Sequence, residues 1–515
     1  MRPSRPGFPP VVPWGAVARG RLGWALLLGL LLGVADARAA CENASRPRAL
    51  SQAEALEDFE LAVAAIEQAF PALDWHRPKG HWRRARRTAR AQLSAVADDV
   101  GLYRLLAPLL ASLGEDHLTL RPSEAMRCHF RQEAALLPLD LYWTERGVSV
   151  LRGFGGAADI PTGARLLTIN GQPWRSLFQE MWRAVGGDGD ITTGVMRELD
   201  GDGYARQRYW LRGKEASFQV RLLLPDGTPR ELTLAPIPLS ARPGTQDTGA
   251  PLATLTWLDT DTAVLRVPTF SNRRYREAGA SYSETLQKLF EELAERKARD
   301  LILDLRDNGG GSESNENVLF SYLVERPIRK YAFVEVRANH FAITSRSGQR
   351  FEQTVFEPEE LATYARTPGG TLRRLDQPLL GLRSHWHPVS PIFKGRLLVL
   401  VGGRTYSGAA ELASMLYSQG RALFLGEEVG GTHAGNSSGY DWTLTLPNSG
   451  LELSVPLIHF RLNVTGLPRN RGVIPHCVLQ PDATEYGVRE DAVYRLAVEL
   501  SERPWHKPSS RLCAR

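Results

Sequence analysis

Two short, largely apolar runs, each followed by glycines, constrain the fold of this chain more than any other feature. Residues 301–305 (LILDL) precede the loop RDNGGG, and residues 397–401 (LLVLV) precede a turn and then a helix-like segment at 408–419. Runs this short and continuous are typical of strands covered on both faces. With a strand at 262–267 and a helix at 275–298, they predict an α/β domain over residues 251–503.

A helical N-terminal domain is predicted over residues 40–135. Ser51 and Glu54 have the spacing of a capping box at the start of a helix. Amphipathic patterns indicate three helices, at 51–70, 82–96 and 99–113.

The next region, residues 136–241, is predicted to be rich in β-strands. PDGT at 225–228 separates two β-rich runs and is a hairpin signal. The segment GARLLTING at 163–171 resembles a strand of PDZ domains. We therefore expect a PDZ-like β-rich domain here, followed by a linker at about 242–250.

Residues 1–39 have the pattern of a secretory signal peptide. Four arginines precede the apolar run WALLLGLLLGV at 24–34, and Ala-Arg-Ala at 37–39 is a small-residue cleavage site. The run is too short to span a bilayer comfortably. The sequence predicts export to the periplasm or the extracellular space, with no stable membrane span. Lipidation of Cys41 is the alternative, although Arg38 stands where a lipobox has an aliphatic residue.

The four cysteines bear on the compartment and on metal binding. In an oxidising environment they allow two disulfides by three connectivities, which the sequence leaves open. No cysteine or histidine cluster has the sequence spacing of a zinc site, so we predict no metal and no cofactor. The cysteines are Cys41, Cys128, Cys477 and Cys513.

The net charge of +6 does not by itself indicate a nucleic-acid partner. The densest basic cluster, at 83–90, falls within one predicted helix. Charge runs of this kind are usually solvated helix faces, and we interpret the cluster in that way.

Three segments carry residues suited to catalysis, and each also has a structural interpretation. The glycines at 309–311 let the backbone turn and present N–H groups, as in an oxyanion hole or a plain turn. Ser407 lies between a strand and a helix, which suits a nucleophile or an ordinary N-cap. His117 follows Asp116 in LGEDHLT, as a general base or a structural histidine would.

Taken together and in order, these segments resemble the C-terminal processing (tail-specific) peptidase family. Its relatives are the tricorn protease core and the interphotoreceptor retinoid-binding protein repeats. DLRDNGG at 304–310 matches the glycine loop of the family, TYS at 405–407 its nucleophile turn, and RGVIP at 471–475 its closing element. The resemblance extends over about residues 59–500. It implies a crotonase-like catalytic domain with a PDZ-like insert and with Ser407 as the nucleophile.

The family uses two catalytic designs. One is a Ser–Lys dyad, but Thr432 stands at the lysine position, and no lysine occurs between Lys394 and Lys507. The other resembles the tricorn core and takes a histidine from the helical domain, at a position that His117 fits. We therefore predict His117 as the general base, with His433 as the alternative.

The remaining candidates come from the same resemblance. The loop GGTHAGN at 430–436 looks like a family loop that ends in Asn436. Asp116 is the acid adjacent to His117, and the sequence leaves open which acid orients the histidine. Backbone N–H groups of Gly408, and of Gly309 or Gly310, are expected to hold an oxyanion.

The implied reaction is acyl transfer. His117 takes the proton of Ser407, the serine attacks a carbonyl, and water releases the acyl group. The expected partner is a peptide or protein substrate, with no nucleic acid, and the oligomeric state stays open. Two other functions also remain open: a non-catalytic peptide- or lipid-binding protein on the same fold, and a serine esterase.

Overall fold

A computed structural model describes Cys41 and residues 47–242, 252–375, 386–504 and 507–513. The predicted signal peptide and nearly all of the predicted linker lie outside the described residues. Residues 46–515 form one compact unit, to which all the elements below belong.

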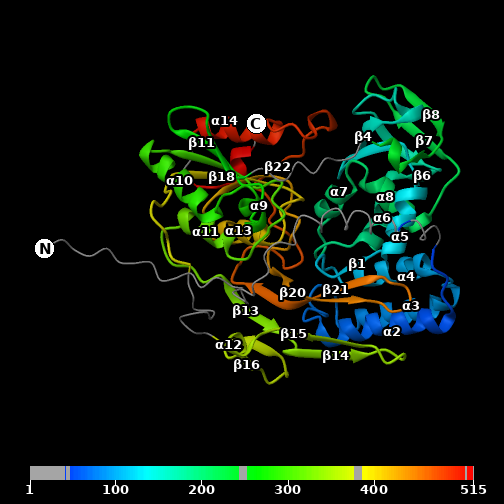
Figure 1. The fold of residues 1–515 in the computed structure, drawn as a ribbon. Helices are drawn as coiled ribbons and strands as arrows, with labels where there is room; N and C mark the ends of the chain where they lie inside the picture. Colours follow the sequence, from blue (N-terminus) through cyan, green and yellow to red (C-terminus); the bar gives the residue numbers. More distant parts are fainter. Residues whose placement is uncertain (1–40, 42–46, 243–251, 376–385, 505–506, 514–515) are drawn as a thin grey trace, which may run out of the picture. The chain divides into compact units, whose positions relative to one another are not determined.

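A six-stranded sheet forms the centre of the C-terminal half (Figure 1). Its strand order is β10-β11-β12-β18-β19-β22, and every neighbouring pair is parallel except β10 with β11. This confirms the predicted strands and places the carboxyl ends of β12 and β18 side by side. The strands are β10 (Thr254–Trp257), β11 (Thr262–Arg266), β12 (Asp300–Asp304), β18 (Arg396–Val401), β19 (Leu423–Gly426) and β22 (Cys477–Val478).

Both faces of the central strands β11, β12, β18 and β19 are buried, which explains why these strands are apolar without alternation. Leu301 and Leu303 of β12 pack into one core, and Ile302 between them packs into the opposite one. Helices α10, α11 and α13 supply residues to the first core, and α14 supplies residues to the second. The helices are α10 (Tyr282–Glu295), α11 (Asn315–Leu323), α13 (Gly408–Ser418) and α14 (Ala492–Glu502).

The helix predicted at 275–298 is two helices. A short α9 (Asn272–Glu277) precedes α10, and Gly279, with a φ of +68°, lies between them. The interruption follows from this glycine, because a left-handed residue cannot continue a right-handed helix.

Residues 136–241 form a second sheet with its own core, as the β-rich pattern predicted. The order is β3-β4-β5-β7-β8, and β6 pairs with β5. The predicted turn at 225–228 joins β7 to β8 in an antiparallel hairpin. The strands are β3 (Leu139–Thr144), β4 (Gly147–Gly153), β5 (Arg165–Ile169), β6 (Gln172–Pro173), β7 (Phe218–Leu223) and β8 (Pro229–Leu234); the helices are α6 (Trp174–Val185), α7 (Thr193–Leu199) and α8 (Gly203–Arg212).

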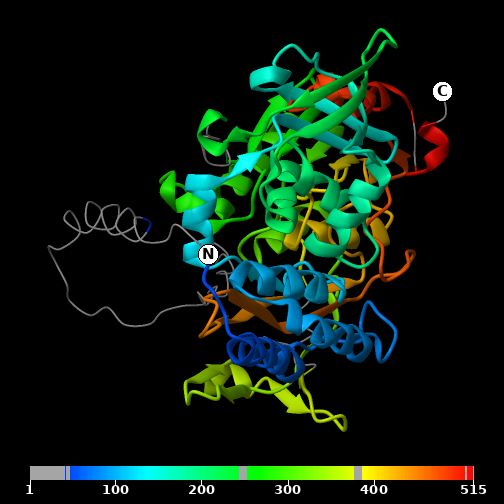
Figure 2. The same cartoon turned by 90° about the vertical axis from the view of Figure 1, so that its right-hand side faces the viewer.

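The N-terminal helices do not have a core of their own. They share one with a third sheet of order β1-β21-β13-β17-β16, in which β20 pairs with β21. In Figure 2 the blue helices lie along the orange strands. The elements are α2 (Gln52–Ala69), α3 (His81–Gln92), α4 (Asp99–Ala111), α5 (Glu124–Glu133), β1 (Thr119–Arg121), β13 (Tyr331–Val336), β16 (Tyr364–Arg366), β17 (Leu372–Arg374), β20 (Gly435–Thr445) and β21 (Glu452–Leu462).

Local signals at the first helix are confirmed. Ser51 caps α2, and Ser51 and Glu54 form the reciprocal capping box. Smaller elements complete the unit: the pair β2 (Ala135–Leu136) and β9 (Ile237–Pro238), the pair β14 (His340–Thr344) and β15 (Arg350–Thr354), and α12 (Pro358–Leu361).

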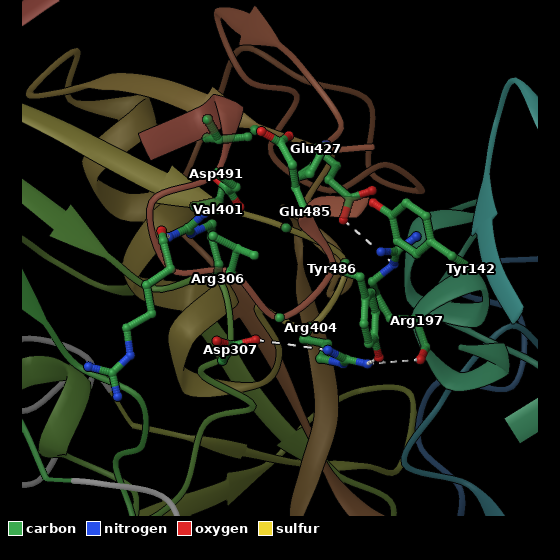
Figure 3. Close-up of a pocket in the computed structure, with 18 of the residues that line it drawn as sticks. Tyr142, Arg197, Arg306, Asp307, Val401, Arg404, Glu427, Glu485, Tyr486 and Asp491 are labelled. Atoms are coloured by element: carbon green, nitrogen blue, oxygen red, sulfur yellow. Dashed lines mark hydrogen bonds and ion pairs between the residues drawn. The ribbon is translucent and has the colours of Figure 1, made fainter. Parts of the chain in front are cut away.

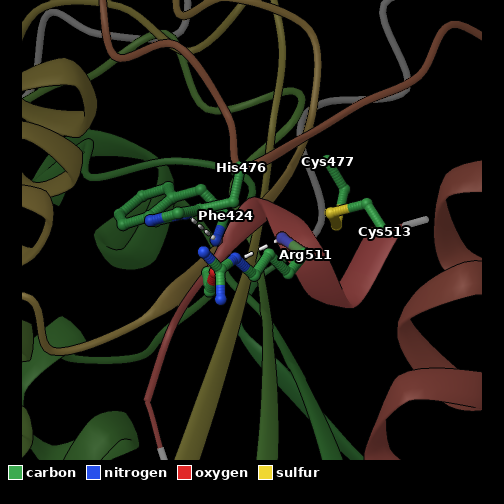
Figure 4. The surroundings of a disulfide bond; sticks show 6 residues. Phe424, His476, Cys477, Arg511 and Cys513 are labelled. Carbon is green, nitrogen blue, oxygen red and sulfur yellow. Dashed lines mark hydrogen bonds between the residues drawn. A yellow bond between two sulfur atoms is a disulfide. The ribbon is translucent and has the colours of Figure 1, made fainter.

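A disulfide ties the end of the described chain to the central sheet (Figure 4). It joins Cys477 of β22 to Cys513, and the adjacent His476 accepts a hydrogen bond from the N–H of Phe424 at 3.1 Å. Within the described ranges, no helix combines the length and the apolar character that crossing a membrane requires.

Candidate active site

Ser407 occupies a strained turn between β18 and α13. Its φ of 50° lies in the left-handed region, which costs a residue with a Cβ about 1–3 kcal/mol unless the surroundings enforce it. Two hydrogen bonds hold the turn against the segment after β12. The N–H of Tyr406 donates to the O of Asn308 at 3.0 Å, and Thr405 Oγ1 donates to the O of Leu305 at 2.8 Å. The turn presents the half-buried serine at the N-terminus of α13.

The glycine loop packs directly against this turn. A Cβ on Gly310 would lie 2.7 Å from the Cβ of Ser407 and 3.1 Å from the N of Gly408, and the φ of Gly310 is +94°. Asn308 holds the loop from within: its Nδ2 donates to the O of Val267, and its Oδ1 accepts the N–H of Gly310, both at 2.9 Å. The N–H of Gly310 is therefore engaged within its own loop, which leaves Gly309 as the alternative donor that the prediction named.

Two of the predicted oxyanion donors are unengaged. Among the described residues, the N–H groups of Gly408 and Gly309 have no acceptor. Gly408 is the first residue of α13, where backbone N–H groups and the helix dipole favour an anion. The turn can thus direct at least one free N–H toward charge that develops beside Ser407.

His117 lies in the loop between α4 and β1, and Glu115 holds it from within that loop. His117 Nδ1 lies 3.3 Å from Glu115 Oε1, and the other carboxylate oxygen accepts the N–H of Ser437 at 3.0 Å. Glu115 is only 3% exposed. The side chain of Asp116 makes no hydrogen bond with His117. The backbone N–H of Asp116 donates to Asp188 Oδ1 at 2.9 Å. Glu115, which the sequence analysis did not single out, is the acid that orients His117.

The site has unusual electrostatics because it is acid-rich and buried. Burial alone would lower the pKa of His117, but the hydrogen bond with Glu115 and the charges of Glu115 and Asp188 raise it to about 9. Burial raises the pKa of Asp116 to about 6 and that of Asp188 well above its ordinary value. Against the effect of burial, His117 lowers the pKa of Glu115. The Glu115 carboxylate therefore favours the imidazolium form of His117 when the histidine takes up a proton.

Asp188, between α6 and α7, connects the histidine loop with the serine turn. A Cβ on Gly431 would lie 3.7 Å from Asp188 Oδ2 and 3.6 Å from the N of Ser407, so both atoms flank the same glycine. The acidic charges also reach the neighbouring Tyr406: burial raises the pKa of its phenol well above the ordinary value, and Asp116 and Asp188 add to the rise.

Ser407 and His117 thus belong to one acid-lined region, but no hydrogen bond joins them among the described residues. In a protein without a bound substrate, catalytic hydrogen bonds are often long and tighten only on binding. The Nδ1 of His117 faces Glu115, so Nε2 is the nitrogen left for the serine.

The two other candidates, from the glycine-rich loop at 430–436, are buried and bind other residues of the interior. His433 Nε2 lies 3.1 Å from the O of Thr465, and its ring packs against Tyr417. Burial lowers the pKa of His433. Asn436 Nδ2 donates to Glu411 Oε1 at 3.3 Å, one turn into α13. Neither side chain forms a hydrogen bond with Ser407 among the described residues.

The structure also brings a lysine near α13, the helix that follows Ser407. The sequence analysis did not predict this. Lys330 is buried, binds Glu316 Oε1 at 2.8 Å, and forms a second ion pair with Glu411. Burial opposes its charge, but the two carboxylates raise the pKa of the Lys330 ammonium well above its ordinary value. Glu316 also lies beside the turn that holds Ser407: a Cβ placed on Gly408 would lie 3.3 Å from Glu316 Oε2. A lysine held in this way stays protonated and cannot act as a base.

A cavity of about 200 Å³ lies at the carboxyl edge of the central sheet (Figure 3). Arg404 crosses it, with Tyr486 Oη at 3.2 Å and a carboxylate oxygen of Asp307 at 3.9 Å. Neither Ser407 nor His117 lines the cavity, although it shares residues 402–404 with the serine turn.

Comparison with known proteins gives a family match for part of the chain, and a fold. Residues 261–479, which contain the glycine loop and the serine turn, match the model of peptidase family S41. No curated protein matches the chain by sequence.

Solved structures of CPAF have the same fold. A CPAF mutant superimposes with a TM-score of 0.62 at 16% identity, covering 88% of this chain and 98% of that one. Mature CPAF complexed with lactacystin gives a TM-score of 0.60 at 16% identity, covering 87% and 97%. Residues 261–479 are therefore similar to peptidase family S41, and the chain has a mixed α/β fold like that of CPAF.

Proposed function

We propose that this protein is an exported serine peptidase in which Ser407 is the nucleophile, His117 the general base and Glu115 the acid that orients the base. The strained turn at Ser407 is the observation that carries the proposal. A left-handed serine at a helix N-terminus, packed against a glycine loop, costs stability, and such strain is concentrated at functional sites.

The geometry supports a stepwise acyl transfer. His117 Nε2 takes the proton of Ser407 as Oγ attacks the carbonyl carbon of a peptide bond. The carboxylate of Glu115, fixed by the N–H of Ser437, stabilises the imidazolium that forms. The N–H of Gly408 donates to the oxyanion, an interaction of about 3 kcal/mol in related systems. His117 then protonates the leaving amine, and water attacks the acyl-enzyme.

The architecture extends the proposal to the substrate. Residues 251–503 would be the crotonase-like catalytic domain, residues 136–241 a PDZ-like domain, and residues 40–135 the helical segment that supplies His117. A PDZ-like sheet binds a peptide by adding it as a strand, which favours a peptide or protein substrate over a small ester.

Export to the periplasm or the extracellular space is part of the same proposal. It is supported by the signal-peptide pattern of residues 1–39 and by the Cys477–Cys513 disulfide. Disulfides persist in oxidising compartments and are rare in the cytosol.

A second candidate, a peptide-binding protein without catalysis, is favoured by one observation: Ser407 and His117 do not share a hydrogen bond among the described residues. Labelling with a fluorophosphonate probe separates the two. We expect wild-type protein and His433→Ala to be labelled, and Ser407→Ala and His117→Ala not to be. Absence of labelling in the wild type, also with peptides added, would favour the binding protein. Hydrolysis of an ester but of no peptide would point to an esterase.

A further inference from the structure

Glu115, His117 and Asp188 have the arrangement of a metal site as well as that of a catalytic acid and base. One ligand atom from each lies within 4.8 Å of the others. The 3.3 Å between His117 Nδ1 and Glu115 Oε1 equals the spacing of about 3.3 Å between two ligands of a tetrahedral zinc ion, given bonds of roughly 2.0–2.2 Å.

A buried oxygen without a partner gives a second, independent indication. Asp188 is 1% exposed, and its Oδ2 has no hydrogen-bond partner among the residues that the structure describes. A buried polar atom left in this way costs free energy and calls for an explanation. A cation bound beside it would remove the cost.

The carboxylates are already fixed in the way that metal ligands usually are. The N–H of Ser437 holds one oxygen of Glu115 at 3.0 Å, and the N–H of Asp116 holds one oxygen of Asp188 at 2.9 Å. Such outer contacts orient the ligating oxygens and add to metal affinity. The side chain of His117 is 26% exposed, which leaves a path for an ion to enter.

We propose that Glu115, His117 and Asp188 bind one divalent transition-metal ion, with zinc as the probe, and that the ion switches off the peptidase. One imidazole nitrogen and two carboxylates suit zinc or manganese better than calcium or magnesium, which take oxygen ligands. Two carboxylates also balance the charge of the ion. Three protein ligands leave a fourth position for water.

Inhibition follows from the ligand role of the histidine. If Nε2 binds the metal, it has no lone pair for the serine proton. If Nδ1 binds the metal, the neutral ring carries its proton on Nε2 and again cannot accept. The inhibitory part rests on the proposed function, whereas the binding part does not.

The test measures zinc binding separately from activity. Untagged protein, stripped with a chelator and dialysed, is titrated with zinc against a chromophoric indicator. We expect one site in the wild type and in Ser407→Ala. Asp188→Asn, whose amide oxygen can still accept from Asp116 N–H, should weaken binding at least ~10-fold. Asp116→Asn, a change in the loop that holds Glu115 and His117, removes no ligand and should not weaken zinc binding.

A second arm measures the effect on the serine. Zinc should suppress fluorophosphonate labelling of the wild type, a chelator should restore it, and magnesium should have no effect. In Asp188→Asn, at least ~10-fold more zinc should be needed for the same suppression. Equal zinc binding by wild type and Asp188→Asn would overturn the site. Binding without suppression would overturn the regulation. If metal-free wild type is not labelled, the serine peptidase fails, while binding by Ser407→Ala still decides the site.

Discussion

Glu115 and His117 stand two residues apart in one loop, and the carboxylate of the first lies 3.3 Å from Nδ1 of the second. The other carboxylate oxygen of Glu115 accepts the N–H of Ser437, so strand β20 fixes the orientation of the carboxylate that holds His117. The nearer acid in sequence, Asp116, is instead tied through its N–H to Asp188. The carboxylate of Glu115 therefore faces the imidazole of His117, although Asp116 is the residue adjacent to the histidine in sequence.

We expect Glu115→Gln to lower kcat about 10²- to 10⁴-fold with little change in KM. The amide oxygen can still accept from Ser437 N–H, so the fold is kept, but the charge that stabilises the imidazolium is lost. The measurement is peptide hydrolysis, with the rate of fluorophosphonate labelling beside it. Asp116→Asn is the matched control, with an expected loss below ~10-fold. A larger loss in the control than in Glu115→Gln would assign the orienting role to Asp116.

We expect Gly310→Ala to abolish labelling of Ser407 and to cost roughly 1–3 kcal/mol of unfolding free energy. The new Cβ would lie 2.7 Å from the Cβ of Ser407, at a φ of +94° that alanine rarely adopts. Gly309→Ala is the control, since a Cβ there meets nothing within 4 Å and alanine keeps the N–H. Urea unfolding and labelling of both variants check this. Normal labelling of Gly310→Ala would mean that the loop does not pack on the serine turn.

We expect Lys330→Met to destabilise the protein by about 3–5 kcal/mol, because it leaves the buried carboxylates of Glu316 and Glu411 without their cation. Combining it with Glu316→Gln and Glu411→Gln removes those charges and should recover most of the loss. Urea unfolding measures both variants. The triple variant should still react with the fluorophosphonate probe. A folded triple variant that does not react would make Lys330 part of the catalytic machinery.

We expect His459 to make the protein acid-sensitive. Its Nε2 is buried without a partner among the described residues, and burial lowers its pKa to about 4. The unfolded chain takes up this proton below about pH 6.5, so stability is present above that pH and is lost as pH falls toward 4. The full loss is about 3 kcal/mol, of which about 2 kcal/mol falls between pH 6.5 and 5.

His459→Gln, whose amide can keep the contact with Ser437 Oγ, should remove that part of the pH dependence. Urea unfolding near pH 7 and near pH 5 gives the comparison, and the difference between the two proteins isolates the histidine from other acid-titrating groups. Equal losses in both proteins would show that His459 does not carry the effect.

The sequence by itself determined the features that depend on local pattern. The apolar runs at 301–305 and 397–401 specify strands covered on both faces, and PDGT specifies a hairpin. Ser407 could be placed at a strand-to-helix turn because strand, turn and helix follow one another directly. In each case the deciding interactions join residues close along the chain, where periodicity and turn chemistry are visible.

Only the tertiary structure decided which groups surround that serine. Asp188 and Ser437 reach the loop that holds His117 from distant segments of the chain. Lys330, the residue before β13, reaches Glu411 of α13 although it lies far from Ser407 in sequence. The expectation of no metal site rested on ligand spacing along the chain. Such spacing does not reveal that Asp188 lies close to Glu115 and His117. From the sequence, Gly309 and Gly310 were equal candidates for the oxyanion donor. Only the structure shows that the N–H of Gly310 donates to the side chain of Asn308. Such contacts depend on how separate layers pack, because burial and loop packing bring the groups together and no local pattern records them.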